Sequence, residues 1–138
     1  MSQDKTADLL SALKNAYAAG RRETCLPLSK FNFAIVKILI EEGYLDDVKK
    51  QKAKTGAGKE MVITLNKLRQ MKDKRSCQII KNIKRISKSS VRVYVSSRDL
   101  DEYNRRLGLA IISTPKGLMT TKQAKKKNFG GELICRVW

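Results

Sequence analysis

The residues best suited to contact a ligand in this 138-residue sequence are short polar and small side chains that follow an apolar stretch. Residues 109–112 are apolar, and they run directly into Ser113, Thr114, Pro115, Lys116 and Gly117. The two hydroxyls can hydrogen-bond phosphate, ribose or base edges, and Gly117 permits a close approach to the backbone. The same five residues are also typical of an ordinary surface turn, so composition alone supports both interpretations about equally.

A glycine pair followed by a carboxylate forms a second candidate. Gly130, Gly131 and Glu132 precede the last apolar stretch of the sequence. Two small residues would let the backbone and the Glu132 carboxylate come close to a nucleic acid. A turn between a helix and a strand explains the glycines as well, and a salt bridge to a neighbouring Lys or Arg is the simpler explanation for Glu132.

Positive charge is concentrated in the second half of the sequence. The chain has 30 Lys and Arg against 13 Asp and Glu, a formal net charge of +17. Residues 1–58 carry +3 of this charge and residues 59–138 carry +14. So large a basic excess predicts a nucleic acid or another polyanion as partner, bound mainly by the second half.

Two basic stretches are the expected source of phosphate contacts. Cations alternate with branched apolar residues between residues 81 and 94, and Tyr94 is the best-placed aromatic for stacking on a base, although a half-buried core tyrosine is equally plausible. Taken alone, residues 122–127 indicate a solvated helix face. If they lie near the hydroxyls and the glycines, they would form a rim that contacts phosphates. The predicted contacts in these stretches are Lys84, Arg85, Ser87, Lys88, Arg92, Tyr94, Lys122 and Lys126.

The missing residue types exclude most catalytic chemistry. The sequence has no histidine, so neither a Ser-His-Asp triad nor a His-ligated metal can form. Cys25, Cys77 and Cys135 are widely spaced and are expected to be reduced, buried thiols. No stretch approaches the roughly 20 apolar residues of a membrane-spanning helix. We therefore expect no enzyme, no cofactor, no metal site and no membrane partner.

The apolar spacing predicts an α+β fold in two parts. The first, residues 1–68, is an N-terminal α+β domain in the order helix, strand, helix, hairpin; its predicted elements are a helix at 6–19, a strand at 21–26, a helix capped by Ser29, and strands at 44–50 and 60–65. The second, residues 69–138, is β-rich and mostly antiparallel with short helices. Its predicted strands are 77–86, 91–95, 107–112 and 132–138, with helices at 98–106 and from 120 or 121.

Three motifs of the second half resemble a known family. They are Arg85-Ile86-Ser87-Lys88 with Val91-Arg92-Val93-Tyr94, then Gly108 to Thr120, then Gly130-Gly131-Glu132 through Cys135 to Trp138. Together they resemble small-subunit ribosomal protein eight in its bacterial form. The first half fits more loosely, through Asp4, Asp8, Leu13, Lys14, Asn15 and Ala16, and through Pro27, Ser29, Lys30 and Glu41 to Tyr44.

The sequence departs from the family pattern at three places. Pro115 stands where the family has a serine, which removes one hydroxyl and one backbone donor. Ser89 and Ser90 replace a Pro-Gly pair before the Arg-x-Tyr segment, and residues 122–127 are more basic than expected.

The resemblance implies a specific function. Members of this family have a two-part α+β fold and bind the central domain of small-subunit rRNA early in assembly, mostly through the C-terminal part. They grip an irregular helix with unpaired bases, sit as monomers beside other small-subunit proteins such as ribosomal protein five, and in many bacteria repress their own operon. The resemblance also implies that the protein is located in a ribosome of the bacterial cytoplasm, or alternatively in the ribosome of an organelle that encodes the chain. A free basic RNA- or DNA-binding regulator, such as that operon repressor, is the alternative. Weaker rRNA contacts are predicted at Asp4, Asn15, Ser29 and Lys30.

Overall fold

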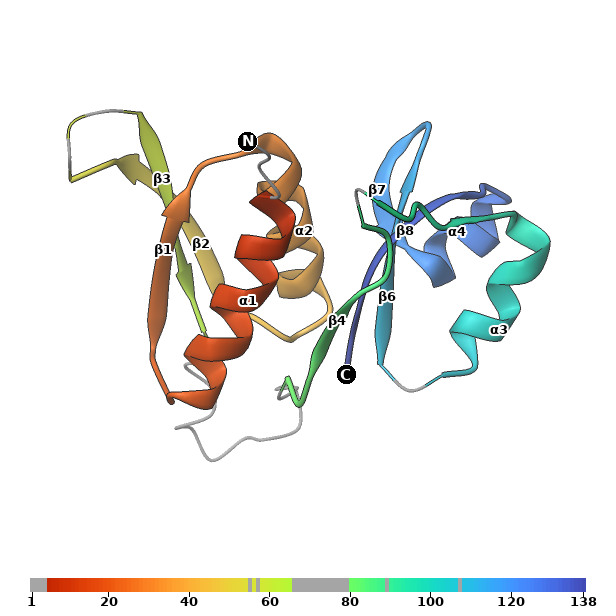
Figure 1. Ribbon diagram of the computed structural model, residues 1–138, viewed down its shortest axis with the longest axis horizontal. Coiled ribbons are helices and arrows are strands. Elements are labelled where there is room, and N and C mark those ends of the chain that lie inside the picture. Colours follow the sequence, from red (N-terminus) through yellow and green to blue (C-terminus); the bar gives the residue numbers. More distant parts are fainter. Residues whose placement is uncertain (1–4, 55, 57, 66–79, 89, 107) are drawn as a thin grey trace. The chain divides into compact units, whose positions relative to one another are not determined.

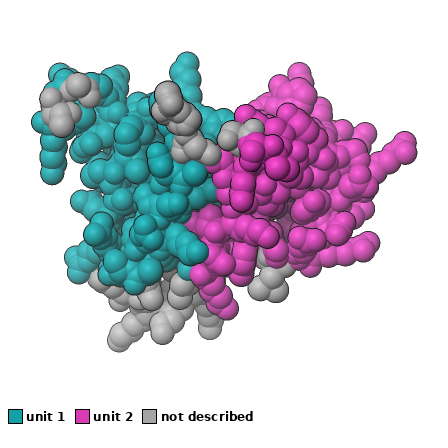
Figure 2. Space-filling model, viewed as in Figure 1, with its two compact units in different colours: residues 1–80 teal, residues 81–138 magenta. Residues whose placement is uncertain are grey.

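Contacts within the chain divide it into two units, residues 1–80 (unit 1) and 81–138 (unit 2) (Figures 1 and 2). The computed structural model describes residues 5–54, 56, 58–65, 80–88, 90–106 and 108–138. The domain boundary predicted after residue 68 lies outside these described residues. Each unit has its own sheet.

Unit 1 is a three-stranded antiparallel sheet with two helices. Its elements are α1 (Lys5–Ala18), β1 (Glu23–Pro27), α2 (Lys30–Glu41), β2 (Asp47–Lys52) and β3 (Lys59–Thr64), and the strand order is β1-β3-β2 (Figure 1). The predicted order of helix, strand, helix and hairpin is therefore confirmed. The register sets Cys25, Val62 and Lys49 side by side across the three strands.

The core of unit 1 follows from two periodicities. Leu9 and Leu13 recur on one face of α1, Ile35 and Leu39 recur on one face of α2, and all four are fully buried. Met61 supplies the sheet side, where buried and partly buried residues alternate along β3. Ser29 occupies the predicted N-cap position of α2 with extended backbone, but its side chain makes no capping hydrogen bond, so the prediction of a side-chain cap is wrong.

Unit 2 is a five-stranded antiparallel sheet with short helices. Its strands are β4 (Ile83–Arg85), β5 (Tyr94–Val95), β6 (Leu109–Thr114), β7 (Gly117–Thr120) and β8 (Gly131–Val137); its helical elements are η3 (Ser97–Asp99), α3 (Leu100–Asn104) and α4 (Thr121–Lys127). The order is β4-β8-β6-β7, and β5 also pairs with β8. β8 is thus the strand on which β4, β5 and β6 all assemble. The two units together confirm the predicted α+β class.

The helices of unit 2 cover one face of this sheet. Leu100 of α3 and Ala124 of α4 are fully buried against Ile112 and Leu133 of the sheet. A bulge between Ile111 and Ile112 adjusts the register of β6 against β8. This packing fixes the strand ends from which the candidate site is built.

The stretch after residue 112 differs from the prediction. The expected loop of hydroxyls is a tight hairpin: β6 continues to Thr114, and β7 begins at Gly117 after a turn made by Pro115 and Lys116. Gly117 has a φ of +114°, which favours glycine. Thr114 Oγ1 donates to the Gly117 carbonyl at 2.8 Å and accepts from the Lys116 N–H at 3.2 Å. The Thr114 hydroxyl therefore holds the turn together.

Two further strand predictions in unit 2 are right in place but too long. Within the described residues of 77–86, only Ile83–Arg85 is a strand, and the strand expected at 91–95 is Tyr94–Val95. The helix expected at 98–106 is the short pair η3 and α3. Short ladders explain the difference, because β4 and β5 each pair with only part of β8.

The two described cysteines differ in their exposure to solvent. Cys135 is fully buried, and this burial raises the pKa of its thiol to about 12, despite the nearby positive charge of Arg85. Cys25 is exposed on the strand β1, so the prediction that it is buried is wrong. Cys77 lies outside the described residues.

Within the described parts of the chain, no helix is long and apolar enough to cross a membrane, and no three Asp, Glu or Cys residues gather as a metal site would require.

Candidate nucleic-acid interface

The predicted site residues meet where three strands of unit 2 end. β8 lies between β5 and β6, and its register sets Glu132 opposite Tyr94 on one side and opposite Ser113 on the other. A hollow of about 550 Å³ opens beside this row. Its lining residues are Tyr94, Val95, Ser96, Ser113, Thr114, Pro115, Gly130, Gly131 and Glu132. Segments 94–96, 113–115 and 130–132, which are distant in sequence, thus form one surface.

The Glu132 carboxylate is the centre of a hydrogen-bonded network. Its Oε1 accepts from Ser87 Oγ at 2.7 Å and from Arg92 Nη1 at 2.9 Å. Ser87 Oγ in turn accepts from the Val93 N–H at 3.2 Å, and Arg85 Nε donates to the Ser87 carbonyl at 2.7 Å. The salt bridge expected for Glu132 is therefore confirmed, with Arg92 as its partner.

Electrostatics keep this carboxylate ionised. Partial burial alone would raise the pKa of Glu132, but hydrogen bonds from Ser87 and Arg92, with the charges of Arg92 and Arg85, lower it overall. Only 18% of the Glu132 side chain is exposed, whereas 54% of the Arg92 side chain is. A fixed negative acceptor therefore faces the hollow within a strongly basic unit.

Ser87 acts inside the protein. It is only 2% exposed, so its hydroxyl cannot reach a ligand directly in this structure. Its hydrogen bonds join residue 87 to Glu132 and to the start of the segment that carries Tyr94. The structure therefore gives this predicted contact residue a positioning role.

The two glycines are required by packing. A Cβ atom on Gly131 would overlap the carbonyl group of Ser113 on the neighbouring strand β6, and one on Gly130 would lie 2.7 Å from the Val95 carbonyl oxygen. Close strand contact, rather than a turn alone, therefore explains the pair. The same lack of side chains leaves the hollow open on this side.

Tyr94 is exposed. Its relative exposure is 70%, and that of Val91, three residues earlier, is 62%. Of the two alternatives for Tyr94, the half-buried core residue is excluded, and an aromatic ring available for stacking is what the structure has. Ser96 also lines the hollow and was missed from the sequence, although the two-residue alternation from Tyr94 was a signal for it.

The predicted cations of unit 2 are distributed over several of its strands, turns and helices. Lys84, on β4, lies opposite Arg136, roughly 13 Å along β8 from Glu132 at 3.3 Å per residue. Lys88, whose backbone hydrogen-bonds with that of Val91, is exposed, and so is Lys116 on the β6–β7 hairpin. Arg85 is only partly exposed. Neither Lys122 nor Lys126 lines the hollow, so the structure does not join these two to it.

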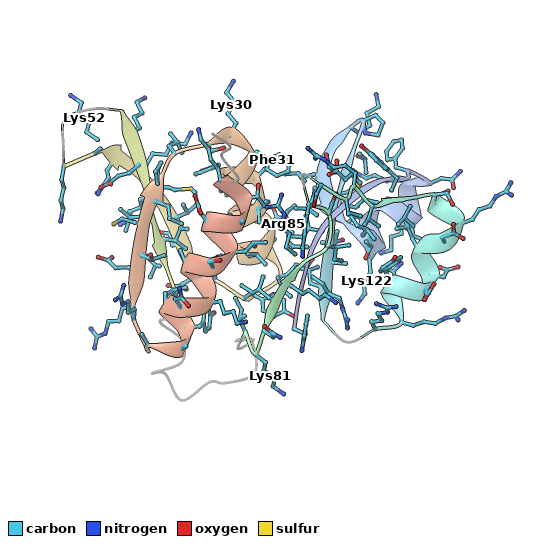
Figure 3. All side chains as sticks on the ribbon, in the orientation of Figure 1. Lys30, Phe31, Lys52, Lys81, Arg85 and Lys122 are labelled. Atoms are coloured by element: carbon cyan, nitrogen blue, oxygen red, sulfur yellow. The ribbon has the colours of Figure 1, made fainter. Side chains whose placement is uncertain are left out.

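A capping box defines the Lys-rich helix. Thr120 Oγ1 accepts from the Gln123 N–H, and Gln123 Oε1 accepts from the Thr120 N–H, both at 3.1 Å. Lys122 and Lys126 are exposed on α4 (Figure 3 labels Lys122). Lys125 instead bridges to Asp101 of α3 at 3.3 Å, so it braces two helices.

The four weaker predictions belong to unit 1. Asp4 lies outside the described residues, and Asn15 is exposed on α1. Ser29 and Lys30 stand at the start of α2, where Lys30 points into solvent (Figure 3). The lining residues of the hollow all belong to unit 2.

The chain is similar to known ribosomal proteins over its whole length. The family described as ribosomal protein S8 matches residues 4–138. Small ribosomal subunit protein uS8 of Kosmotoga olearia is 41% identical over 139 residues, and that of Thermus aquaticus is 38% identical over 138 residues; each match covers 100% of both chains. The protein of that name from Thermus thermophilus is 37% identical over 138 residues, again across both chains in full.

These matches define the class as structural ribosomal proteins of the small subunit, which are not enzymes. Within that class, the chain belongs to the ribosomal protein S8 family. The resemblance seen in the sequence motifs is thereby confirmed, and so is the prediction of a non-catalytic protein.

Proposed function

We propose that the chain binds the central domain of small-subunit rRNA directly, through unit 2, and helps that domain to assemble. The row Tyr94–Glu132–Ser113 beside the hollow is the observation that carries this proposal. The chain would act as a monomer in a bacterial or organellar ribosome, next to other small-subunit proteins such as ribosomal protein five. Its family membership supports this setting.

The hollow suits an unpaired base. A-form RNA hides its major groove, so a protein reads shape, 2′-hydroxyls and splayed bases. Tyr94 offers a ring for stacking, Ser113 offers a hydroxyl, and Glu132 offers an ionised acceptor to exocyclic amino or ring N–H groups. Of the two carboxylate oxygens of Glu132, only Oε1 has protein donors among the described residues, which leaves Oε2 for such a group.

Exposed cations around unit 2 would supply affinity without base specificity. Residues 81–138 contain 14 Lys and Arg and four Asp and Glu, and most of these cations are exposed. Phosphate contacts orient a protein on RNA, and each contact releases counterions from the RNA, which makes binding more dependent on salt. The proposed phosphate contacts are Lys84, Lys88, Arg92, Lys116, Lys122 and Lys126.

The first test separates stacking from charge. We expect Tyr94→Leu to weaken binding to an irregular central-domain helix roughly 5- to 150-fold, the equivalent of about 1–3 kcal/mol for one stacked base. Tyr94→Phe keeps the ring and should bind nearly as the wild type does. Fluorescence anisotropy at fixed salt measures both. Equal affinity of the wild type for this helix and for a plain RNA duplex would refute the proposed base recognition.

The second test measures the phosphate contacts and whether the chain associates with small ribosomal subunits. The double variant Lys116→Gln, Lys122→Gln should make the slope of log K against log salt shallower by about 1.4 to 1.8, for two contacts. The same variant should lower affinity for the helix and the duplex alike. Sedimentation of the chain with small ribosomal subunits is expected; a free regulator would stay in the supernatant and bind double-stranded DNA comparably.

A further inference from the structure

Unit 1 holds a cluster of two lysines on one aromatic ring. The Lys50 Nζ atom lies over the Phe33 ring at 4.6 Å from its centroid, and the Lys37 Nζ atom lies over it at 5.9 Å. Phe33 and Lys37 are one turn apart on α2, whereas Lys50 comes from β2, which packs against α2. We call these three residues the Phe33 cluster.

The positive charge of the Phe33 cluster is not neutralised within the described residues. No carboxylate there forms an ion pair with Lys37 or Lys50, although Glu41 follows Lys37 by one turn on the same helix. Both ammonium groups approach one centroid, so their separation cannot exceed the sum of the two distances, close to the Debye length of about 10 Å at 0.1 M salt. Their mutual repulsion is therefore only partly screened, and a bound anion would relieve it.

The geometry prepares the two lysines for a ligand. Both lysine residues are exposed while Phe33 is partly buried, so the ring holds the side chains in place and leaves them accessible to solvent. Holding a long side chain reduces the conformational entropy that binding would otherwise remove. Lys30 stands three residues before Phe33 on the same side of α2 and points into solvent (Figure 3). Exposed lysines that are held close together can contact the phosphates of a nucleic acid.

We propose that the Phe33 cluster is a second RNA contact, on unit 1, that binds the phosphodiester backbone. It rests on the proposed function, because it assigns to the first half of the chain a share in holding the same RNA. The two lysines would contact phosphates, and Phe33 would keep them oriented. This contact adds affinity and no base specificity.

The test uses the full chain and a transcript of the complete central domain. The double variant Lys37→Gln, Lys50→Gln should make the salt slope shallower by about 1.4 to 1.8 and weaken binding about 30-fold at 0.1 M salt, the value for two lost phosphate contacts. Phe33→Leu keeps an apolar side chain but removes the ring, so it should weaken binding less, with both lysines still present.

The matched control is Lys14→Gln, Lys49→Gln. Lys14 is exposed on the other helix, and Lys49 precedes Lys50 on β2, so it points to the opposite face of the sheet. A loss of RNA affinity in the control equal to that in the double variant would overturn the proposal, since any two lysines would then suffice. Unchanged RNA binding in the double variant would also overturn the proposal. If that variant binds an acidic protein less tightly than the wild type does, the cluster contacts acidic proteins and not RNA.

The two proposals fail in different ways. If the wild-type chain does not bind the central domain at all, the proposed function fails. If the wild type binds, and Tyr94→Leu weakens it while the double variant matches its control, only the Phe33 cluster proposal fails. Circular dichroism of each variant checks that the two helices of unit 1 are retained.

Discussion

Replacing Glu132 by alanine tests whether the network beneath the hollow stabilises unit 2. The change removes the acceptor of the Ser87 hydroxyl, which is almost completely buried. A buried donor left without an acceptor costs about 1–3 kcal/mol, and the lost ion pair with the half-exposed Arg92 adds roughly 0.2–1 kcal/mol. We therefore expect Glu132→Ala to lower the free energy of unfolding of unit 2 by about 2 kcal/mol at pH 7.

Urea denaturation followed by tryptophan fluorescence measures this loss in unit 2. Trp138 is the single tryptophan of the sequence, and its backbone pairs with Asn82 next to β4 and β8. Its signal therefore reports the sheet that contains Glu132, whether or not the two units unfold together. With a urea dependence of about 1–3 kcal/mol per molar, a loss of 2 kcal/mol shifts the midpoint by roughly 1 M.

Two controls decide the cause of the shift. Glu102→Ala removes an exposed carboxylate that pairs with Arg106, and it should cost less than about 0.5 kcal/mol. Glu132→Gln keeps an oxygen that can accept from Ser87, so it should cost less than Glu132→Ala. A loss in Glu132→Ala no greater than that in Glu102→Ala would refute the argument that the buried hydroxyl depends on Glu132.

The pH dependence of the same network has a definite sign. A carboxyl whose folded pKa is lowered stabilises the fold above its unfolded pKa, near 4.5, and this stabilisation is lost as the pH falls through the folded pKa. The difference in stability between the wild type and Glu132→Gln should therefore be constant above about pH 5.5 and shrink below pH 4.5. A difference that grows on acidification would contradict the lowered pKa.

Two further predictions concern packing. Gly131→Ala should destabilise unit 2 by more than Gly56→Ala destabilises unit 1, since the added Cβ overlaps the Ser113 carbonyl, whereas Gly56 has a positive φ but open space around it; urea denaturation of both variants checks this. In the native protein a thiol reagent should modify Cys25 within minutes and leave Cys135, which is buried and has a raised pKa, unmodified until denaturant is added. Peptide mass spectrometry identifies the modified cysteine in each case, and equal labelling of the two would contradict the burial of Cys135.

The elements that the sequence predicts well are those with a repeated local pattern. The spacing of Leu9, Leu10 and Leu13 marks α1, and that of Ile35 and Leu39 marks α2, because a helix buries one face at every turn. The strand β7 was missed, since four residues are too short for alternation to be recognised. A prediction based on local pattern is strongest where the element is long.

The candidate site could be predicted by residue type but not by arrangement. Tyr94, Ser113 and Glu132 were all proposed from the sequence, yet only the strand order puts them in one row. Ser87 and Glu132 are 45 residues apart, and no local signal shows that one hydrogen-bonds the other. Likewise, the sequence suggests that the Thr114 hydroxyl is available to a ligand. Only the structure shows that this hydroxyl is already hydrogen-bonded to the Gly117 carbonyl within the turn.

The pairing of β4, β5 and β6 with β8 has a consequence for the order in which unit 2 folds. β8 follows all its partners in the chain, so during synthesis β4 and β5 have no strand to pair with until residues 131–137 are available. Among the described strands of unit 2, only the hairpin of β6 and β7 can close locally, and joining β4 to β8 requires closing a loop of nearly fifty residues. Unit 2 therefore depends on late, long-range contacts, and the surface that combines Tyr94, Ser113 and Glu132 exists only once the sheet is complete.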